Sequence, residues 1–303
     1  MNRKGSSGKD KTGNRFQNLP EIKENIGLMA FLTKCFPEKS RSAIKSLLSH
    51  KLVLVNQKDI SLYNYNLNPG DQVVLLKGKS QAGEDLTGIK ILFEDDYLIV
   101  IEKAAGLLSI STSEEKERTA YSLLSRHVKN ADKPGHVFVL HRLDKETSGV
   151  MMFAKNKEVQ STMQNNWREM VLERSYTAIV EGKVLNPENT ITSHLIESKA
   201  MKIHKTKNTE EGQLAVTHYK VISQLKEFAL VNVVLETGRK NQIRVHMQDM
   251  GNPIIGDKKY GAKTNPIVRL GLHASLLVFR HPISKDVLRF ESPIPKSFLR
   301  LVK

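Results

Sequence analysis

The stretch HRLDKETSGVMMFAK, residues 141–155, runs from a cluster of polar and charged side chains into an apolar segment. The apolar segment HVFVL (136–140) precedes it, and both apolar segments are typical of buried strands. The polar cluster therefore lies between two predicted strands. At its centre one carboxylate, Asp144, is flanked by the cations Arg142 and Lys145.

Three kinds of site are compatible with this cluster. A metal site could use His136 and His141, but a spacing of five along a strand puts them on opposite faces. A hydrolase could combine Ser148, His141 and Asp144, yet the chain has no Gly-x-Ser-x-Gly elbow there, and the residues around Ser148 are typical of a turn. The third interpretation is a single functional carboxylate, Asp144, held beside cations at the end of a strand.

The composition favours an RNA-binding or DNA-binding protein. The chain has 303 residues and a formal net charge of +15, and such a basic excess indicates a polyanionic partner. No basic amphipathic helix is evident, which favours nucleic acid over a membrane surface, and the longest apolar runs are too short to span a bilayer. The N-terminal residues lack an apolar signal region and Cys35 is the sole cysteine, so we expect a cytoplasmic protein.

The pattern of the chain predicts four segments. Strand patterns outnumber helix patterns in the last of them, and many neighbouring strands look antiparallel. The predicted segments are a basic disordered tail at 1–20, a small α/β module at 21–78, a linker at 79–88 and a large domain at 89–303.

Helical spacing predicts helices at several places. In the module, NIGLMAFLTKCF (25–36) places Ile26, Met29, Ala30 and Phe36 on one face. In the large domain the same argument predicts helices over 119–129, 157–172 and 241–250, the last ended by a glycine and a proline.

Two segments of the module resemble the ribosomal S-four RNA-binding domain. These are SRSAIKSLLSHKLVLVNQKDI (40–60) and LNPGDQVVLL (67–76), which repeat its Ser-Arg-Ser helix start, Val-x-Val-Asn strand and Gly-Asp turn. The resemblance implies RNA binding. Arg41 and Lys45, four residues apart on one helix face, are the residues that we expect to contact phosphates; the alternative is a solvated helix face.

The large domain resembles the RluA-type pseudouridine synthase family over residues 89–303. The family motifs occur in order, as HRLDKETSGV (141–150), SYTAIVEG (175–182), LETGRKNQIRVH (235–246), PIIGDKKYG (253–261) and LGLHASLLVFRHP (270–282). The resemblance implies an α+β fold, with a mixed, mostly antiparallel central sheet and flanking helices. It also implies an enzyme that isomerises uridine to pseudouridine in RNA.

The resemblance assigns roles to individual residues. Asp144 is implied as the catalytic carboxylate, acting either by covalent attack or by assisting a sugar intermediate. Tyr176 is implied beside the base, where it helps carbon 5 to lose its proton, and Arg244 is implied in an ion pair that keeps Asp144 ionised and aimed. Arg142 is implied to hold the space that the flipped uridine vacates, and Arg239 to contact the RNA. The reaction is an isomerisation, so we expect no cofactor and no metal.

The chain departs from the family pattern at Asn241, where the family has histidine. Because an amide cannot become cationic near neutral pH, no acid–base role is carried over to this position. This departure supports an alternative function, a noncatalytic RNA-binding or ribosome-assembly factor. Gly256-Asp257 and Tyr260-Gly261 are interpreted as structural turns. We expect a monomer that acts on ribosomal RNA, most favourably of the large subunit, with transfer RNA as the other possible substrate.

Overall fold

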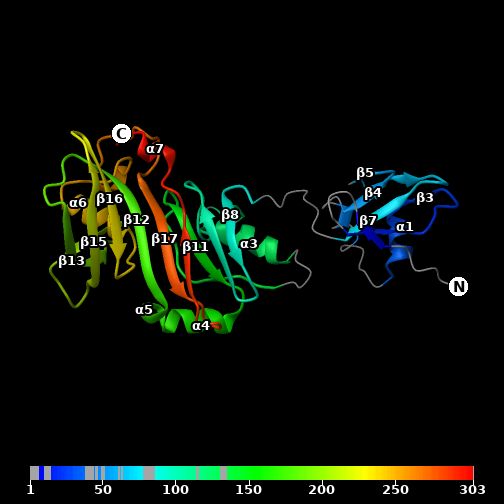
Figure 1. Cartoon of the computed structure of the whole chain (residues 1–303), viewed down its shortest axis with the longest axis horizontal. Coiled ribbons are helices and arrows are strands. Elements are labelled where there is room, and N and C mark those ends of the chain that lie inside the picture. Colours follow the sequence, from blue (N-terminus) through cyan, green and yellow to red (C-terminus); the bar gives the residue numbers. More distant parts are fainter. Residues whose placement is uncertain are drawn as a thin grey trace. The chain divides into compact units, whose positions relative to one another are not determined.

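The computed structural model of the chain describes residues 7–9, 15–37, 44, 47–48, 52–60, 62, 64–77, 86–113, 115, 117–129 and 135–302. The chain forms two compact units, Met1–Asp85 and Leu86–Lys303 (Figure 1). The division between them falls inside residues 79–88, the predicted linker.

Unit 1 packs one described helix against small sheets. The helix α1 (Leu28–Cys35) buries Leu28 and Leu32 against Ile44, Leu48 and Val53. One sheet has the order β1-β2-β7-β4-β5, and β3 pairs with β6. The strands are β1 (Ser7–Lys9), β2 (Arg15–Asn18), β3 (Ile26–Gly27), β4 (Val53–Val55), β5 (Lys58–Asp59), β6 (Asn66–Leu67) and β7 (Val73–Lys77).

Unit 1 differs from the expectations in two places. Strands β1 and β2 lie inside the segment 1–20 that was expected to be disordered, and β2 pairs with β7. Backbone pairing to a strand edge makes no demand on side-chain type, so a polar sequence does not reveal it. In the first helix, Ile26 belongs to β3 and Ala30 is exposed, so the predicted apolar face was partly wrong. Arg41 and Lys45 lie outside the described residues.

Unit 2 is built on an 11-stranded sheet. Nine of its strands follow the order β14-β13-β15-β16-β12-β17-β11-β9-β8, and the other two, β10 and β18, pair with β11 and β17. Among the described strands, only β11 and β17 pair in parallel. The predicted α+β class with a mostly antiparallel sheet is confirmed. The strands are β8 (Ile89–Glu94), β9 (Leu98–Lys103), β10 (Phe138–Val139), β11 (Ser148–Ala154), β12 (Val171–Glu181), β13 (Glu188–Glu197), β14 (Ile203–Thr206), β15 (Gln213–Gln224), β16 (Phe228–Leu235), β17 (Leu272–Arg280) and β18 (Val287–Glu291).

Helices cover both faces of the sheet around β9 and β11. Met151 and Phe153 pack with α3 (Ala120–Lys129), whereas Met152 and Ala154, on the opposite face of the same strand, pack with α4 (Lys157–Asn165). Because successive residues of a strand point to opposite faces, burial on both sides requires a continuous apolar run. This explains the apolar sequence after the polar cluster.

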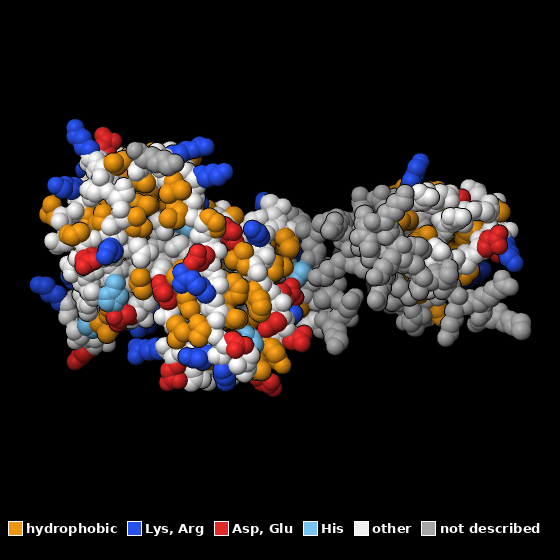
Figure 2. Space-filling view, in the orientation of Figure 1, with side chains coloured by type: hydrophobic (Ala, Val, Ile, Leu, Met, Phe, Trp, Pro, Cys, Tyr) orange, Lys and Arg blue, Asp and Glu red, His pale blue; other side chains and the backbone are white. Residues whose placement is uncertain are grey.

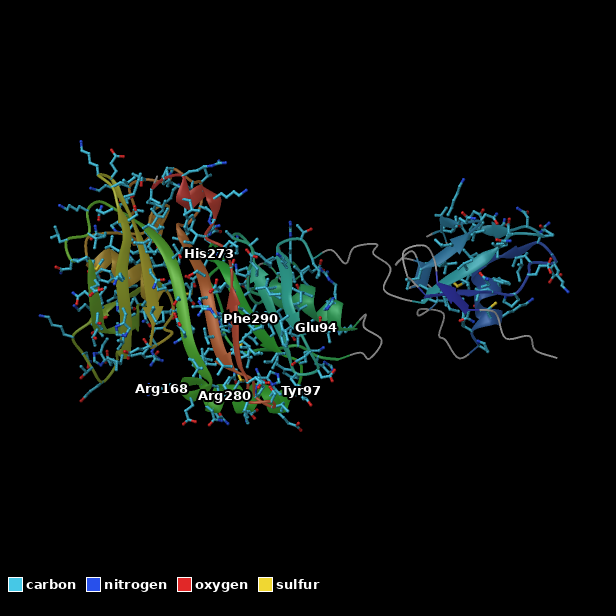
Figure 3. All side chains as sticks on the ribbon, viewed as in Figure 1. Glu94, Tyr97, Arg168, His273, Arg280 and Phe290 are labelled. Atoms are coloured by element: carbon cyan, nitrogen blue, oxygen red, sulfur yellow. The ribbon has the colours of Figure 1, made fainter. Side chains whose placement is uncertain are left out.

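The remaining helices of unit 2 are short. The helix predicted over 157–172 is interrupted at Asn166, which ends α4 and precedes α5 (Trp167–Met170). Arg168 of α5 and Arg280 at the end of β17 lie at the same end of the unit (Figure 3). The others are α6 (Gln242–Asp249), the 3₁₀ helix η1 (Lys258–Tyr260) and α7 (Lys296–Leu299).

A glycine makes the parallel pairing of β11 and β17 possible. Gly149 has a φ of 117°, and a Cβ atom there would lie 2.1 Å from the carbonyl oxygen of Ala274. No residue with a side chain fits so close to a neighbouring backbone. The Ser-Gly pair of HRLDKETSGV therefore brings the chain from the polar cluster directly into the centre of the sheet.

The surface of unit 2 carries both signs of charge. Figure 2 shows lysine and arginine side chains interspersed with acidic ones on the face in view. Among the described residues, no helix is long and apolar enough to cross a membrane.

Candidate active site

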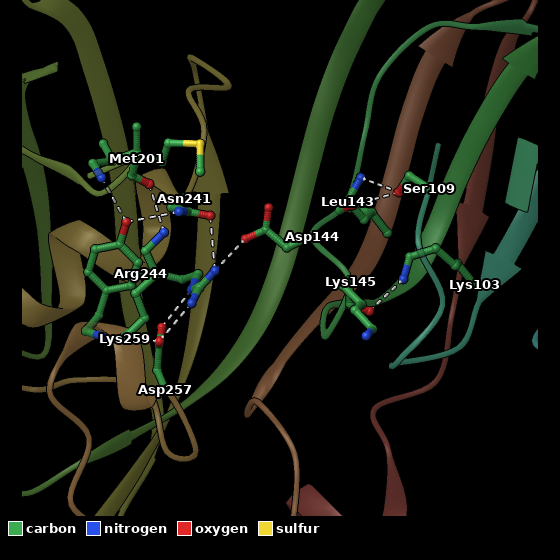
Figure 4. A network of polar contacts seen from close by, with 12 residues as sticks. Lys103, Ser109, Leu143, Asp144, Lys145, Met201, Asn241, Arg244, Asp257 and Lys259 are labelled. Carbon is green, nitrogen blue, oxygen red and sulfur yellow. Dashed lines mark hydrogen bonds and ion pairs between the residues drawn. The ribbon is translucent and has the colours of Figure 1, made fainter. Parts of the chain in front are cut away.

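The polar cluster forms an irregular loop between β10 and β11 that is fixed to the underlying chain. Ser109 Oγ donates to the carbonyl of Leu143 at 2.6 Å and accepts from its N–H at 3.1 Å. The buried Lys103 donates through Nζ to the carbonyl oxygens of Leu107 at 2.7 Å and Lys145 at 3.2 Å (Figure 4). These bonds hold the backbone on both sides of Asp144.

Arg244 lies at the centre of the polar network. Its Nη1 donates to Asp144 Oδ2 at 3.0 Å, so the expected ion pair is present. Its Nε and Nη2 donate to the two carboxylate oxygens of Asp257 at 2.7 and 2.8 Å, and its guanidinium lies 4.8 Å from the ring centroid of Tyr260 (Figure 4). The bidentate pair and the ring fix the plane of the guanidinium.

The electrostatic surroundings keep Arg244 cationic. Burial lowers its pKa, but the hydrogen bonds and charge of Asp257, followed by those of Asp144, raise it above its ordinary value. Asp144 Oδ1 accepts no hydrogen bond from any residue that the structure describes, and the side chain of Asp144 is 29% exposed. One oxygen of this carboxylate is thus held by Arg244 and the other is available to a ligand.

Asn241 connects Arg244 to Tyr260. Its Oδ1 accepts from Arg244 Nη1 at 3.0 Å, and its Nδ2 donates to Tyr260 Oη at 2.9 Å. Its backbone is left-handed, with a φ of 56°, a conformation that asparagine adopts more readily than most residues. The residue that departs from the family pattern therefore takes part in the network as a neutral link.

The candidate residues meet at one cleft. A cavity of ≈ 1080 Å³ and an adjoining one of ≈ 70 Å³ share Arg142, Asp144, Tyr176, Arg239 and Asn241 as lining residues, and Arg244 lines the smaller one. The side chain of Arg142 is exposed and bonds to none of the described residues, whereas Arg239 Nε donates to the carbonyl of Leu214 at 3.0 Å.

Tyr176 is half-buried on β12 and faces this cleft. Burial raises the pKa of its hydroxyl, the positive charge of Arg174 lowers it, and the negative charge of Asp144 raises it. Because the net shift is upward, the phenol is neutral at neutral pH. Tyr176 therefore presents an uncharged aromatic ring to the cleft.

The two alternative kinds of site are not assembled. Ser148 Oγ hydrogen-bonds with Nδ1 of His273 on β17 at 2.8 Å and accepts from Arg269, so its partners are neither His141 nor Asp144. His141 Nε2 accepts from the N–H of Met152 at 3.0 Å, and burial lowers the pKa of its imidazole to about 3. A hydrolytic trio of Ser148, His141 and Asp144 is thus excluded. No three potential metal-binding side chains form a group within the described part of the chain.

Sequence reasoning missed several residues of this site. Asp257 and Tyr260 were interpreted as parts of turns, yet both contact Arg244. The ordered Gly-Asp-x-x-Tyr-Gly motif is visible in the sequence and was the available signal. The sequence alone does not show that this motif lies next to Arg244 in the fold. Arg174, which also lines the larger cavity, carried no signal beyond its place near Tyr176.

Comparisons with known proteins identify the family of the chain. A family model described as RNA pseudouridylate synthase matches residues 97–249, and an S4 domain model matches residues 26–73. The chain is 33% identical over 271 residues to the uncharacterized RNA pseudouridine synthase YhcT of Bacillus subtilis, covering 87% of this chain and 88% of that protein. It is 32% identical over 291 residues to the ribosomal large subunit pseudouridine synthase D of Buchnera aphidicola, covering 89% and 92%.

A solved structure shows the same likeness. Human RNA pseudouridylate synthase domain containing 4 superimposes with a TM-score of 0.56 at 27% identity, over 69% of this chain and 90% of that one. The fold, the ordered motifs and these matches lead to one conclusion: the chain belongs to the RNA pseudouridine synthase family and is an isomerase with an N-terminal S4 RNA-binding domain.

Proposed function

We propose that this enzyme isomerises uridine in large-subunit ribosomal RNA and that Asp144 is its catalytic carboxylate. The observation that carries the proposal is the position of Asp144 in the wall of the large cavity. Arg244 holds one carboxylate oxygen, and the other accepts no bond from a described residue. A carboxylate held by a rigid cation is prepared to act on a bound sugar.

The chemistry needs little beyond this carboxylate. The bond between uracil nitrogen 1 and ribose carbon 1 breaks, a bond from uracil carbon 5 to the same ribose carbon forms, and the proton on carbon 5 is lost while nitrogen 1 gains one. Substrate and product are isomers. Asp144 acts at the ribose carbon during the exchange, either as a nucleophile or by stabilising positive charge on the sugar.

Tyr176 and Arg142 have complementary roles in this proposal. The neutral ring of Tyr176 lies beside the base, holds it while carbon 5 is turned toward the sugar, and helps carbon 5 to lose its proton. The exposed Arg142, which has no partner among the described residues, extends into the RNA and occupies the place of the flipped uridine. Flipping costs a few kcal/mol, and least in a loop where stacking is already weak.

The choice of ribosomal RNA rests on the relatives and on the S4 domain. Several relatives are named ribosomal large subunit pseudouridine synthase D, and they align with 89–94% of this chain. Large-subunit ribosomal RNA and a transfer RNA mixture, each transcribed with tritium at uracil carbon 5, provide the test. We expect tritium release from the ribosomal transcript. Release from the transfer RNA mixture alone would contradict the proposed substrate while leaving the isomerase activity intact.

A further inference from the structure

Arg174 occupies the large cavity without a counterion. It lies on β12 two residues before Tyr176, so both side chains point from the same face of the strand. Its Nη2 donates to the carbonyl oxygens of Glu236 at 3.1 Å and Leu235 at 3.4 Å. No carboxylate of a described residue forms an ion pair with it, in contrast to Arg244, which is paired with two.

Contacts with neighbouring residues fix the position of the Arg174 guanidinium. It lies 5.9 Å from the ring centroid of Trp167, which in turn lies 5.6 Å from the ring of His141. Gly238 leaves the necessary room, because a Cβ atom there would lie 2.5 Å from Arg174 Nη1. The ring, the two carbonyl oxygens and the glycine hold the cation in one orientation at the cavity wall.

A half-buried cation without a counterion is costly unless a ligand supplies the negative charge. Burial lowers the pKa of Arg174, yet a guanidinium stays protonated in proteins, so the positive charge persists. The cavity of ≈ 1080 Å³ that it lines is slightly larger than the roughly 300–1000 Å³ of typical ligand pockets. This cavity has room for the sugar–phosphate backbone of the RNA beside a uracil ring.

We propose that Arg174 binds a phosphodiester of the RNA next to the target uridine and so fixes the strand relative to Asp144. This inference rests on the proposed function, since it assumes that the uridine enters the same cavity. A guanidinium suits this task because its planar donors match two phosphate oxygens. Trp167 acts as a positioning residue that supports the cation.

The proposal is tested by measuring how salt affects binding of the protein to a fluorescein-labelled nonamer of uridylate. For each variant, the logarithm of Kd is plotted against the logarithm of the KCl concentration, and the slope of this plot is compared. Each phosphate contact on a single strand contributes about 0.7 to that slope. We expect Arg174→Gln to weaken binding roughly tenfold and to reduce the slope by about 0.7. Arg174→Lys keeps the charge and should keep the slope.

The matched control is Arg289→Gln. Arg289 is exposed on β18, pairs with Glu291 and lines neither cavity, so the same loss of charge there should leave the slope unchanged. Urea unfolding of each variant checks the fold. Equal slopes for the two glutamine variants, or a lysine variant that behaves like Arg174→Gln, would overturn the proposal.

Tritium release measured on the same preparations separates this inference from the proposed function. If wild type releases tritium but the slopes are equal, the phosphate site is wrong and the isomerase assignment stands. If the slopes differ as expected but no RNA tested yields tritium, Arg174 binds phosphate and the assignment of the reaction fails.

Discussion

At the scale of single residues, the orientation of Asp144 depends on how Arg244 is held. Asp257 is 2% exposed and binds the guanidinium through both oxygens, whereas Asp144 uses only one. The buried carboxylate thus fixes the cation, and the cation in turn orients the half-exposed one. Asn241 accepts a second hydrogen bond from Nη1, the nitrogen that also donates to Asp144, and its amide stays neutral at every pH at which the protein is folded.

The role of Asn241 leads to a prediction about catalysis. Asn241→Ala removes the bonds to Arg244 and to Tyr260, so Arg244 loses part of its support. We expect kcat for tritium release to fall about tenfold, equivalent to one hydrogen bond of about 1.4 kcal/mol, with KM little changed. Asn189→Ala, an exposed substitution on β13, is the control. A change confined to KM would argue that Asn241 contacts RNA instead.

At the scale of elements, the packing of α6 against the strands that it covers positions a residue of the site. Ile243 and Met247 of α6 pack with Val231 and Val233 of β16, which turns Arg244 toward Asp144. On the same helix, His246 is fully buried between Ser193 and Thr217, with its two ring nitrogens 2.9 Å from their hydroxyl oxygens. This histidine makes the stability of the helix sensitive to acid.

The predicted effect follows from the pKa of His246. Burial, and secondarily the charge of Lys205, lowers it to about 4 in the folded state, compared with about 6.5 in an unfolded chain. Between these values the unfolded chain binds a proton that the folded chain does not. The free energy of unfolding should therefore fall as the pH is lowered through this range, by up to about 1.4 kcal/mol per pH unit.

Urea unfolding at pH 6.5 and pH 4.5 checks this expectation. His246→Gln keeps hydrogen-bonding groups but cannot bind a proton, so its free energy of unfolding should fall less between the two pH values than that of wild type. His204→Gln, an exposed change on β14, should behave as wild type does. The same dependence on pH in His246→Gln and wild type would show that His246 is not responsible.

The sequence predicted the positions of helices and strands better than the breaks within them and the pairing between them. Apolar runs and helical spacing predicted β11, α3 and α6, because burial imposes those patterns directly. The break at Asn166 was missed because Trp167 and Met170 continue the apolar spacing of α4 beyond it. The pairing of β2 was missed because it depends on backbone groups and not on side chains.

The site was predicted to a similar degree. The resemblance and the motifs placed Asp144, Tyr176, Arg142 and Arg239, and the structure brings all four to one cleft. Contacts that no motif implied could not be predicted in the same way. The bidentate pairing of Arg244 with Asp257 and the missing counterion of Arg174 are properties of the folded cleft alone.

At the scale of the whole molecule, the net charge of +15 fits an enzyme whose substrate is a polyanion. The cations of the large cavity exceed its acidic residues; they are Arg142, Arg168, Arg174, Arg239 and Lys240 against Asp144, Glu169 and Glu236. The S4 domain gives a second surface for RNA. Because one chain carries two RNA-binding units, a change in one unit can weaken the affinity for RNA without changing the rate of the reaction in the other.

This separation predicts the effect of changing unit 1. Arg41→Glu combined with Lys45→Glu should weaken binding to large-subunit ribosomal RNA and lower its salt dependence, because phosphate contacts are lost. Tritium release from saturating concentrations of RNA should change little. Lys34→Glu with Lys58→Glu, two other basic positions of unit 1, is the control for charge. Loss of turnover at saturation would mean that the S4 domain also helps to position the uridine.

The catalytic role of Asp144 can be measured by tritium release from large-subunit ribosomal RNA labelled at uracil carbon 5. Asp144→Asn keeps the shape of the side chain and removes its charge, whereas Asp286→Asn makes the same change at an exposed position away from the cavities. If Asp144 is the catalytic carboxylate, Asp144→Asn lowers the rate by roughly a thousandfold or more and Asp286→Asn matches wild type. Equal release from Asp144→Asn and wild type would contradict this role.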